Sequence, residues 1–372
     1  MSIYIILFLY TALICAIYDH LFSKNANAVF ELKGKKLFIG PVKLVLAFLI
    51  YFPIVFVMGF RYNIGTDYQA YERYFYAIMA NREIYTYMET GYNYLNYFVF
   101  LFSDNAQMMF LLVSIIICIP FLKSIKNLNG EYFLGALFFM SNGYYIWAMN
   151  GQRQFIAITL VFYGFKYLEN KNFKNYILLC AIAFLFHRTA IFCVLLYFAI
   201  NFFKTQTFCA VSFVIGIMVK VFHYALVSVF VNNDFYAGYL NDRQWGSNRF
   251  LTSDFSPRSV LIAIIFLIIL LVIRRYGKFD ERQWDMRWRM AWILLVGFLF
   301  FYDFGNGAIR VLYYINTVYI LIFSDLFTCL LDKKTKWFRL PAMLPLLAWM
   351  IYLIVLADGG RGYYLPFNFR FS

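Results

Sequence analysis

The stretch NYILLCAIAFLFHRTAIFCVLLYFAINFF, residues 175–203, decides how the chain is threaded through a bilayer. The polar pair His187 and Arg188 separates two apolar halves, each shorter than the roughly 20 residues that a spanning helix needs. Backbone that leaves the helix at membrane depth is tolerated only where it is buried in protein or lines a cavity. We therefore interpret residues 174–202 as a broken or re-entrant helical hairpin with His187 and Arg188 at its tip.

The composition of the whole chain is that of a membrane protein. Of its 372 residues 63% are hydrophobic and 14% are charged, against roughly 45–50% and 25% in soluble domains. Residues 2–18, SIYIILFLYTALICAIY, lack the basic start and the cleavage site of a signal peptide, so we expect a retained first span. The sequence predicts an all-α, polytopic integral membrane protein whose single membrane domain covers residues 1–372.

Apolar runs of spanning length recur from end to end and predict about 11 transmembrane helices. We expect residues 92–103 to form an additional short helix at the membrane surface. The predicted spans are residues 3–20, 41–60, 106–123, 132–149, 152–168, the broken region 174–202, 207–230, 258–274, 287–302, 309–330 and 340–357.

The positive-inside rule assigns the loops to the two sides of the membrane. The lysine- and arginine-rich loops are predicted to be cytoplasmic: 20–43, 123–131, 166–174, 274–289 and 333–339. A single crossing at 174–202 would move the six basic residues of 274–289 to the outer side, so both ends of the hairpin are placed in the cytoplasm. The outward segments are then 61–105, with short helices, 150–153, 231–258, 302–310 and 358–372.

Every basic residue on the predicted outer side is an arginine: 61, 73, 82, 153, 243, 249, 258, 310, 361 and 370. An arginine fork grips phosphate oxygens in a bidentate way that lysine cannot match. Arg61 ends the second span, Arg153 lies in the first turn of the fifth, and Arg310 opens the tenth. They predict an outward-facing cavity for a phosphate-bearing substrate, with Arg188 as a further contact. Contacts with lipid headgroups are the alternative.

Two carboxylates lie in the predicted outer segment 61–105. Asp67 is either a general base or sugar ligand, or a first-turn residue of a helix that Thr66 and Gln69 cap in a capping box. Glu89 is a second candidate for binding sugar. Aromatic rings stack on the C–H faces of sugars, so we add the remaining sugar-binding candidates: Tyr68, Tyr71, Tyr92, Gln154, Tyr313 and Tyr314.

His187 is the histidine predicted at membrane depth beside a charged neighbour. An ionisable residue there is a functional candidate, and a neutral imidazole could accept the proton of a sugar hydroxyl. The alternative is a structural hydrogen bond at the helix break. The six cysteines lie in apolar segments without metal-ligand spacing, so we expect no metal and no cofactor. The net charge of +14 reflects the inter-helix loops and does not indicate a nucleic-acid partner.

Several of these stretches resemble, in order, the EpsG-like family of Wzy-type polysaccharide polymerases. FRYNIGTDYQAYERYF (60–75) and ETGYNYLNYF (89–98) resemble its opening signature. NGQRQFIAITLVFYGFKYLENKNFKNYILLCAIAFLFHRTAIFCVLLYF (150–198) is similar to its middle block. RVLYYINTVYI (310–320) and YYLPFNFRF (363–371) resemble its closing features. Residues 205–305 carry no such motif.

The resemblance implies a multi-pass enzyme of the bacterial cytoplasmic (inner) membrane, with its site facing the periplasm or exterior. It would join undecaprenyl-diphosphate-linked oligosaccharide units, as donor and acceptor, into O-antigen, capsule or exopolysaccharide. A chain-length regulator and a flippase are candidate partners. We assign Arg153, Arg310 and Arg61 to the diphosphate, His187 as the preferred base and Asp67 as the second choice.

Two other functions stay open at this point. A flippase or transporter for the same lipid-linked oligosaccharide would share the arginine cavity. A membrane acyltransferase that modifies the polysaccharide would need a catalytic histidine with access to an acyl donor from the cytoplasm.

Overall fold

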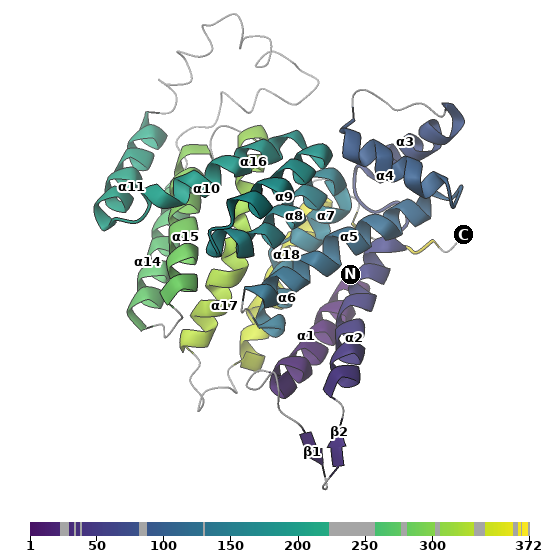
Figure 1. Cartoon of the computed structure of the whole chain (residues 1–372), viewed down its shortest axis with the longest axis horizontal. Helices are drawn as coiled ribbons and strands as arrows, with labels where there is room; N and C mark the ends of the chain where they lie inside the picture. Colours follow the sequence, from purple (N-terminus) through teal and green to yellow (C-terminus); the bar gives the residue numbers. More distant parts are fainter. Residues whose placement is uncertain are drawn as a thin grey trace, which may run out of the picture. The chain divides into compact units, whose positions relative to one another are not determined.

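The structure is a computed structural model, and it describes residues 1–22, 30–32, 35–37, 39–81, 88–128, 131–222, 257–276, 281–301, 306–330, 339–359, 364–365 and 367–370. Nearly all of them are helical, as expected (Figure 1). One antiparallel pair of short strands, β1 (Phe30–Leu32) and β2 (Lys35–Leu37), lies in the segment predicted as a cytoplasmic loop. Strands of three residues are too short for an alternating apolar pattern to reveal.

Three helices are individually long and apolar enough to cross a membrane, judged by length and composition within the described residues. They are α1 (Ser2–Phe22), α2 (Ile39–Gly59) and α5 (Ala106–Asn127). α2 packs on both α1 and α5, and Figure 1 shows α1 and α2 side by side. Shorter apolar helices accompany them, so the chain is a membrane protein, while the number of about 11 spans stays a prediction.

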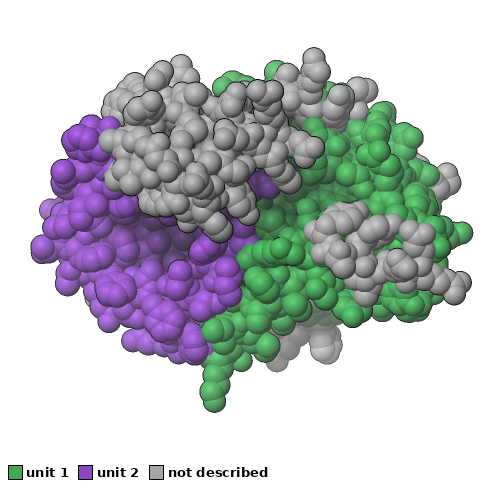
Figure 2. Space-filling view, turned by 90° about the horizontal axis from the view of Figure 1, so that it is seen from above, with its two compact units in different colours: residues 1–166, 174–188, 331–372 green, residues 167–173, 189–330 purple. Residues whose placement is uncertain are grey.

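The chain divides into two compact units, which Figure 2 colours separately. Unit 1 contains residues 1–166, 174–188 and 331–372, and unit 2 contains residues 167–173 and 189–330. The single membrane domain of residues 1–372 stays a prediction.

In unit 1, α3 (Tyr68–Asn81) and α4 (Thr90–Phe100) pack on each other and on α5. The predicted span 132–149 is two helices, α6 (Tyr132–Ser141) and α7 (Tyr144–Asn150). They separate at Gly143, whose φ of 81° favours glycine and whose Cα faces the Trp147 ring. α8 (Gln152–Glu169) follows at once, and α18 (Arg339–Gly359) packs on α6 and α1.

Unit 2 is built around α15 (Glu281–Phe301). The helices that pack on α15 are α10 (Phe192–Phe202), α11 (Gln206–Val221), α14 (Pro257–Tyr276), α16 (Asn306–Asn316) and α17 (Val318–Leu330). Arg287 and Asp325 are both buried and pair through Nη1 at 2.5 and 2.6 Å. The predicted span 309–330 consists of two helices, α16 and α17, which separate at Thr317.

The stretch 175–203 is broken at its polar centre. α9 (Phe173–Phe186) ends just before His187, a short 3-10 turn covers Arg188–Ile191, and α10 follows. Phe173, at the start of α9, contacts the rings of Tyr197 and Phe198 with centroids 4.9 and 5.8 Å apart. The Tyr197 hydroxyl also donates to the Lys171 carbonyl at 3.1 Å. The helix is thus interrupted at His187, while a hairpin whose two ends both enter from the cytoplasm stays a prediction.

Residues near the C-terminus close the C-terminal end of α2. In this C-terminal strap (residues 364–365 and 367–370), Asn368 O accepts from Tyr62 N at 2.8 Å and Arg370 N donates to Phe60 O at 2.9 Å. The Arg370 side chain donates to Glu72 of α3 at 2.5 Å. The strap therefore joins the end of α2 to the first half of α3. The predicted outer segment 231–258 lies outside the described residues.

Candidate active site

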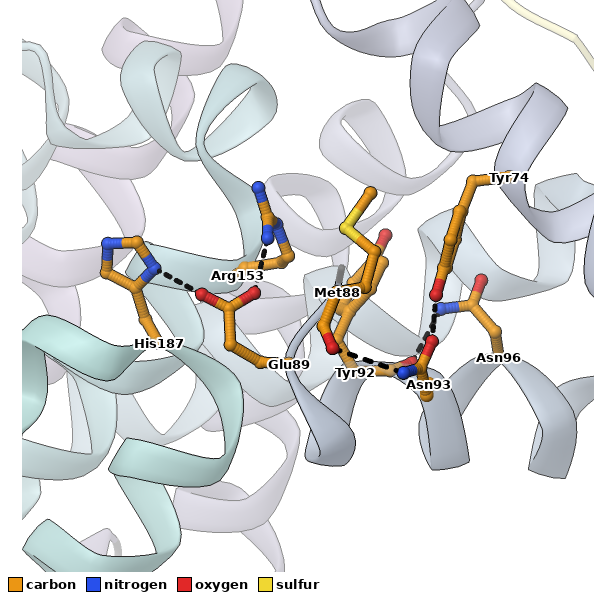
Figure 3. A network of polar contacts seen from close by, with 8 residues as sticks. All are labelled: Tyr74, Met88, Glu89, Tyr92, Asn93, Asn96, Arg153 and His187. Carbon is orange, nitrogen blue, oxygen red and sulfur yellow. Dashed lines mark hydrogen bonds and ion pairs between the residues drawn. The ribbon is translucent and has the colours of Figure 1, made fainter. Parts of the chain in front are cut away.

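Glu89 lies between Arg153 and His187, and this trio is the candidate site (Figure 3). Glu89 Oε1 is 3.0 Å from His187 Nδ1, and Glu89 Oε2 accepts a hydrogen bond from Arg153 Nη1. The side chains of Glu89 and His187 are 10% and 15% exposed and that of Arg153 is 28% exposed. The structure thus brings together three residues that the sequence proposed for separate tasks.

Each member of the trio lies at the end of a helix. Glu89 immediately precedes α4, Arg153 is the second residue of α8, and His187 follows α9, where its N–H donates to Ala183 O at 2.9 Å. All three belong to unit 1. Helix ends leave backbone groups without intrahelical partners, so polar groups of three helices converge at the trio.

Gly91 allows α4 to approach α9 closely enough for this contact. A Cβ added at Gly91 would lie 2.8 Å from the Leu185 carbonyl oxygen, well inside van der Waals contact. Leu185 is two residues before His187. A larger residue at position 91 would separate Glu89 from His187, so glycine is required by close backbone approach.

The charges at the site fix the protonation of Glu89. Burial alone would raise the pKa of this carboxyl, but the hydrogen bond with His187 and the positive charge of Arg153 lower it to about 2. Glu89 is therefore ionised at neutral pH and can only accept hydrogen bonds. It follows that His187 Nδ1 carries the hydrogen in this contact.

The second ring nitrogen of His187 is placed differently. Nε2 is buried and has no hydrogen-bond partner among the described residues. In a neutral ring whose Nδ1 donates, Nε2 bears the lone pair. The arrangement can therefore accept a proton at Nε2 while the carboxylate of Glu89 stabilises the resulting imidazolium.

Tyrosines proposed as sugar platforms are packed into unit 1. Tyr68 and Tyr92 are 1% and 0% exposed, and Tyr71 is 4% exposed. Tyr68 stacks on Phe110 with centroids 4.5 Å apart, and the Tyr92 hydroxyl donates to Gln152 Oε1 at 3.1 Å. Figure 3 shows the neighbouring contact of Tyr74 with Asn93. These side chains hold α3 and α4 in place, so their contact with a sugar stays a prediction.

Arg61 occupies a different place from Arg153. Its side chain is buried, and its guanidinium donates to Met58 O at 2.5 Å and to Met149 O at 2.9 Å. The guanidinium also lies 4.8 Å from the centre of the Phe110 ring. Since it joins the C-terminal ends of α2 and α7, where a cation is favoured, we do not include it in the site. In the sequence, this structural role of Arg61 was indicated by its position directly after an apolar span.

Asp67 is exposed and lies on the turn before α3. The expected capping box is not formed, because Gln69 Nε2 donates to Asn63 Oδ1 at 3.1 Å instead of returning to Thr66. Asn150 performs the linking role: its Oδ1 accepts from Thr66 Oγ1 and from Asp67 N, both at 2.8 Å. Sequence reasoning missed Asn150, because no local spacing connects residues 67 and 150.

The remaining candidates lie elsewhere. Arg188 is exposed in the 3-10 turn next to His187, and Gln154 is buried in the first turn of α8. Arg310 is exposed on α16 in unit 2, one turn later in its helix than expected. Also in unit 2, Tyr313 is half-buried and the hydroxyl of the buried Tyr314 is 3.0 Å from Thr189 Oγ1. A shared anion site of Arg153 and Arg310 stays a prediction.

The described residues contain no group of three or more His, Cys, Asp or Glu side chains placed to hold a metal ion. In comparisons with known proteins, the family model described as the EpsG family matches residues 44–369. No curated protein and no solved structure matches the chain. The match covers the trio, the hairpin and most of the C-terminal strap.

Proposed function

Because the chain belongs to the EpsG family, of membrane proteins in polysaccharide biosynthesis, we propose that it is a polysaccharide polymerase. It joins oligosaccharide units carried on undecaprenyl diphosphate at the outer face of the bacterial cytoplasmic membrane. The observation that carries the proposal is His187, whose Nδ1 is held by Glu89 and whose Nε2 has no partner among the described residues.

The reaction is a glycosyl transfer in which the acceptor hydroxyl attacks the anomeric carbon of the donor. The bond between that carbon and the diphosphate oxygen breaks, and the diphosphate leaves with the electron pair. The hydroxyl proton passes to His187 Nε2, which is general base catalysis. Arg153 donates one N–H to Glu89 and has further donors for the phosphate oxygens, where negative charge develops.

The charge balance of the trio suits this step. Glu89 and Arg153 neutralise each other, so the site gains one positive charge when His187 takes the proton. That positive charge forms while the diphosphate leaves, so it would stabilise the negative charge that develops on the leaving group. A flippase moves its cargo without breaking a bond and has no need of a base with one nitrogen fixed. This is why the geometry favours group transfer over transport.

Polymerisation is tested with the purified protein in detergent or vesicles, given lipid-linked repeat units and no other enzyme. We expect a ladder of products from the wild type. His187→Gln should slow it by roughly 10²–10⁴-fold and Arg153→Ala by about 10²–10³-fold. Arg310→Ala should also abolish long products. The exposed residues His20 and Arg73 supply matched controls, His20→Ala and Arg73→Ala, which should keep the ladder.

Other outcomes identify the alternatives. Translocation of the lipid-linked unit without a ladder would show a flippase. Transfer of an acyl group to the unit, lost in His187→Gln, would show an acyltransferase. A normal ladder from His187→Gln would remove the histidine from the chemistry.

A further inference from the structure

We propose that Glu89 is a positioning residue that sets the tautomer of His187 and the orientation of Arg153 at the same time. The inference rests on the proposed function, since it concerns the base and the phosphate ligand of that reaction. The sequence had suggested Glu89 as a sugar contact, and the structure assigns its two oxygens to protein side chains.

The position of Glu89 explains why its oxygens are available. A Ser, Thr, Asp or Asn directly before a helix often turns its side-chain oxygen back to the first N–H groups. Glu89 has the extended backbone of such a residue, with φ −66° and ψ 140°, yet its side chain makes no capping hydrogen bond. The carboxylate points instead to α8 and the end of α9, where Oε2 meets Arg153 and Oε1 meets His187 (Figure 3).

The two contacts are coupled because both partners donate to one acceptor group. Arg153 can never accept a hydrogen bond, whereas His187 Nδ1 can donate or accept. With a carboxylate between them, both partners donate, so a neutral His187 keeps its lone pair at Nε2. Glu89 therefore determines which ring nitrogen faces the acceptor hydroxyl without touching that hydroxyl.

An amide at position 89 can satisfy both partners in only one orientation. In Glu89→Gln the amide oxygen must face Arg153, because the amide NH₂ cannot meet another obligate donor. The NH₂ then faces His187 Nδ1 and requires it to accept. The hydrogen of a neutral His187 moves to Nε2, so the base is lost although the shape and the arginine contact remain. A carboxylate that served only as a structural ion pair would not control the tautomer.

Nitrogen NMR tests this with isotopically labelled histidine in the full-length protein. The chain has three histidines, so the His187 signals are identified by their loss in His187→Gln. In the wild type we expect the hydrogen on Nδ1, and in Glu89→Gln on Nε2. Glu89→Asp should largely restore the wild-type pattern. Asp104→Asn, at an exposed loop residue, is the matched carboxylate-to-amide control and should leave the spectrum unchanged.

Polymerisation by the same variants completes the test. Glu89→Gln should lower the rate by roughly 10²–10⁴-fold, as expected when a base is held in the wrong tautomer, while donor binding is largely retained. A wild-type His187 with its hydrogen on Nε2 would overturn the inference. So would a switched tautomer with an unchanged rate.

Failure of the proposed function gives a different result. A wild type that makes no ladder, under conditions where the lipid-linked unit binds, would refute the polymerase. The spectra would then still show whether Glu89 holds the Nδ1 hydrogen. The spectra therefore test the positioning role of Glu89, and the products separately test the polymerase reaction.

Discussion

Glu89 is the residue whose charge holds the candidate site together. It is the common partner of Arg153 and His187, and each of these would lose a charged contact at a partly buried position without it. Removing one member of such a group leaves the others desolvated and unpaired. Glu89 should therefore contribute to folding stability as well as to chemistry.

The contribution of Glu89 to stability should depend on pH in a defined direction. Its pKa is lowered from 4.5 to about 2 in the folded protein, so the stabilisation is complete above pH 4.5 and is lost as the pH falls towards 2. We expect the Tm difference between the wild type and Glu89→Gln to be constant above about pH 5 and to shrink below it. Thermal unfolding in detergent measures this difference. A Tm gap that does not change down to pH 3 would contradict it.

Single residues show what the sequence could and could not reveal. Arg153, His187 and Glu89 were all named as candidates, because charged groups beside apolar spans are costly and therefore informative. Their mutual contact was not foreseen, since it joins three helix ends distant in the chain. Arg61 carried the same signal as Arg153, yet its guanidinium lies on backbone carbonyls.

At the scale of the helices, the close approach of α4 to α9 decides whether the trio can form. Gly91→Ala would place a methyl group 2.8 Å from the Leu185 carbonyl oxygen. We expect α4 to shift, with a cost of about 1–3 kcal/mol and at least a tenfold loss of polymerisation. Gly40→Ala in α2 is the matched control, because no atom lies within 4 Å of its added Cβ.

Product ladders and Tm values check the effect of Gly91→Ala. The nitrogen spectrum of His187 adds a direct view of the lost contact. Wild-type activity with an unchanged spectrum would show that α4 does not need this approach. A loss of activity in Gly40→Ala as well would show that the effect is not specific to the site.

The helices were predicted with uneven success, for a physical reason. Apolar length alone located α1, α2 and α5 within a few residues, because a bilayer sets the length of a span. The divisions at Gly143 and Thr317 were missed, since an apolar run continues through each break. The break at His187 was visible because polar residues mark it.

On the scale of the whole molecule, the C-terminal strap links the end of the chain to the loop that leads into α3. Its contacts include two backbone pairs, from Tyr62 N to Asn368 O and from Arg370 N to Phe60 O, and ring contacts of Phe367 and Phe369. The ion pair of Arg370 with Glu72 is partly exposed, at 32% and 21%. We therefore expect the backbone pairs to contribute more than the ion pair.

Shortening the chain tests whether the backbone pairs contribute more to stability than the ion pair. Arg370→Ala should change stability by about 1 kcal/mol or less, as partly exposed ion pairs do. Deletion of residues 364–372 should lower the Tm clearly more and reduce the yield of long product. Heating in detergent followed by size-exclusion chromatography compares the two variants. Equal Tm values for the deletion and the wild type would show that the strap is not needed.

The strap also sets an order of events during synthesis. Glu72 and Arg370 are 298 residues apart, and a ribosome adds roughly 5–20 residues per second. About 15–60 s therefore pass between the appearance of one partner and the other. During that interval the first helices are already made, but the C-terminal end of α2 lacks its last neighbour. A nascent chain that stalls before residue 367 would still lack these contacts at the C-terminal end of α2.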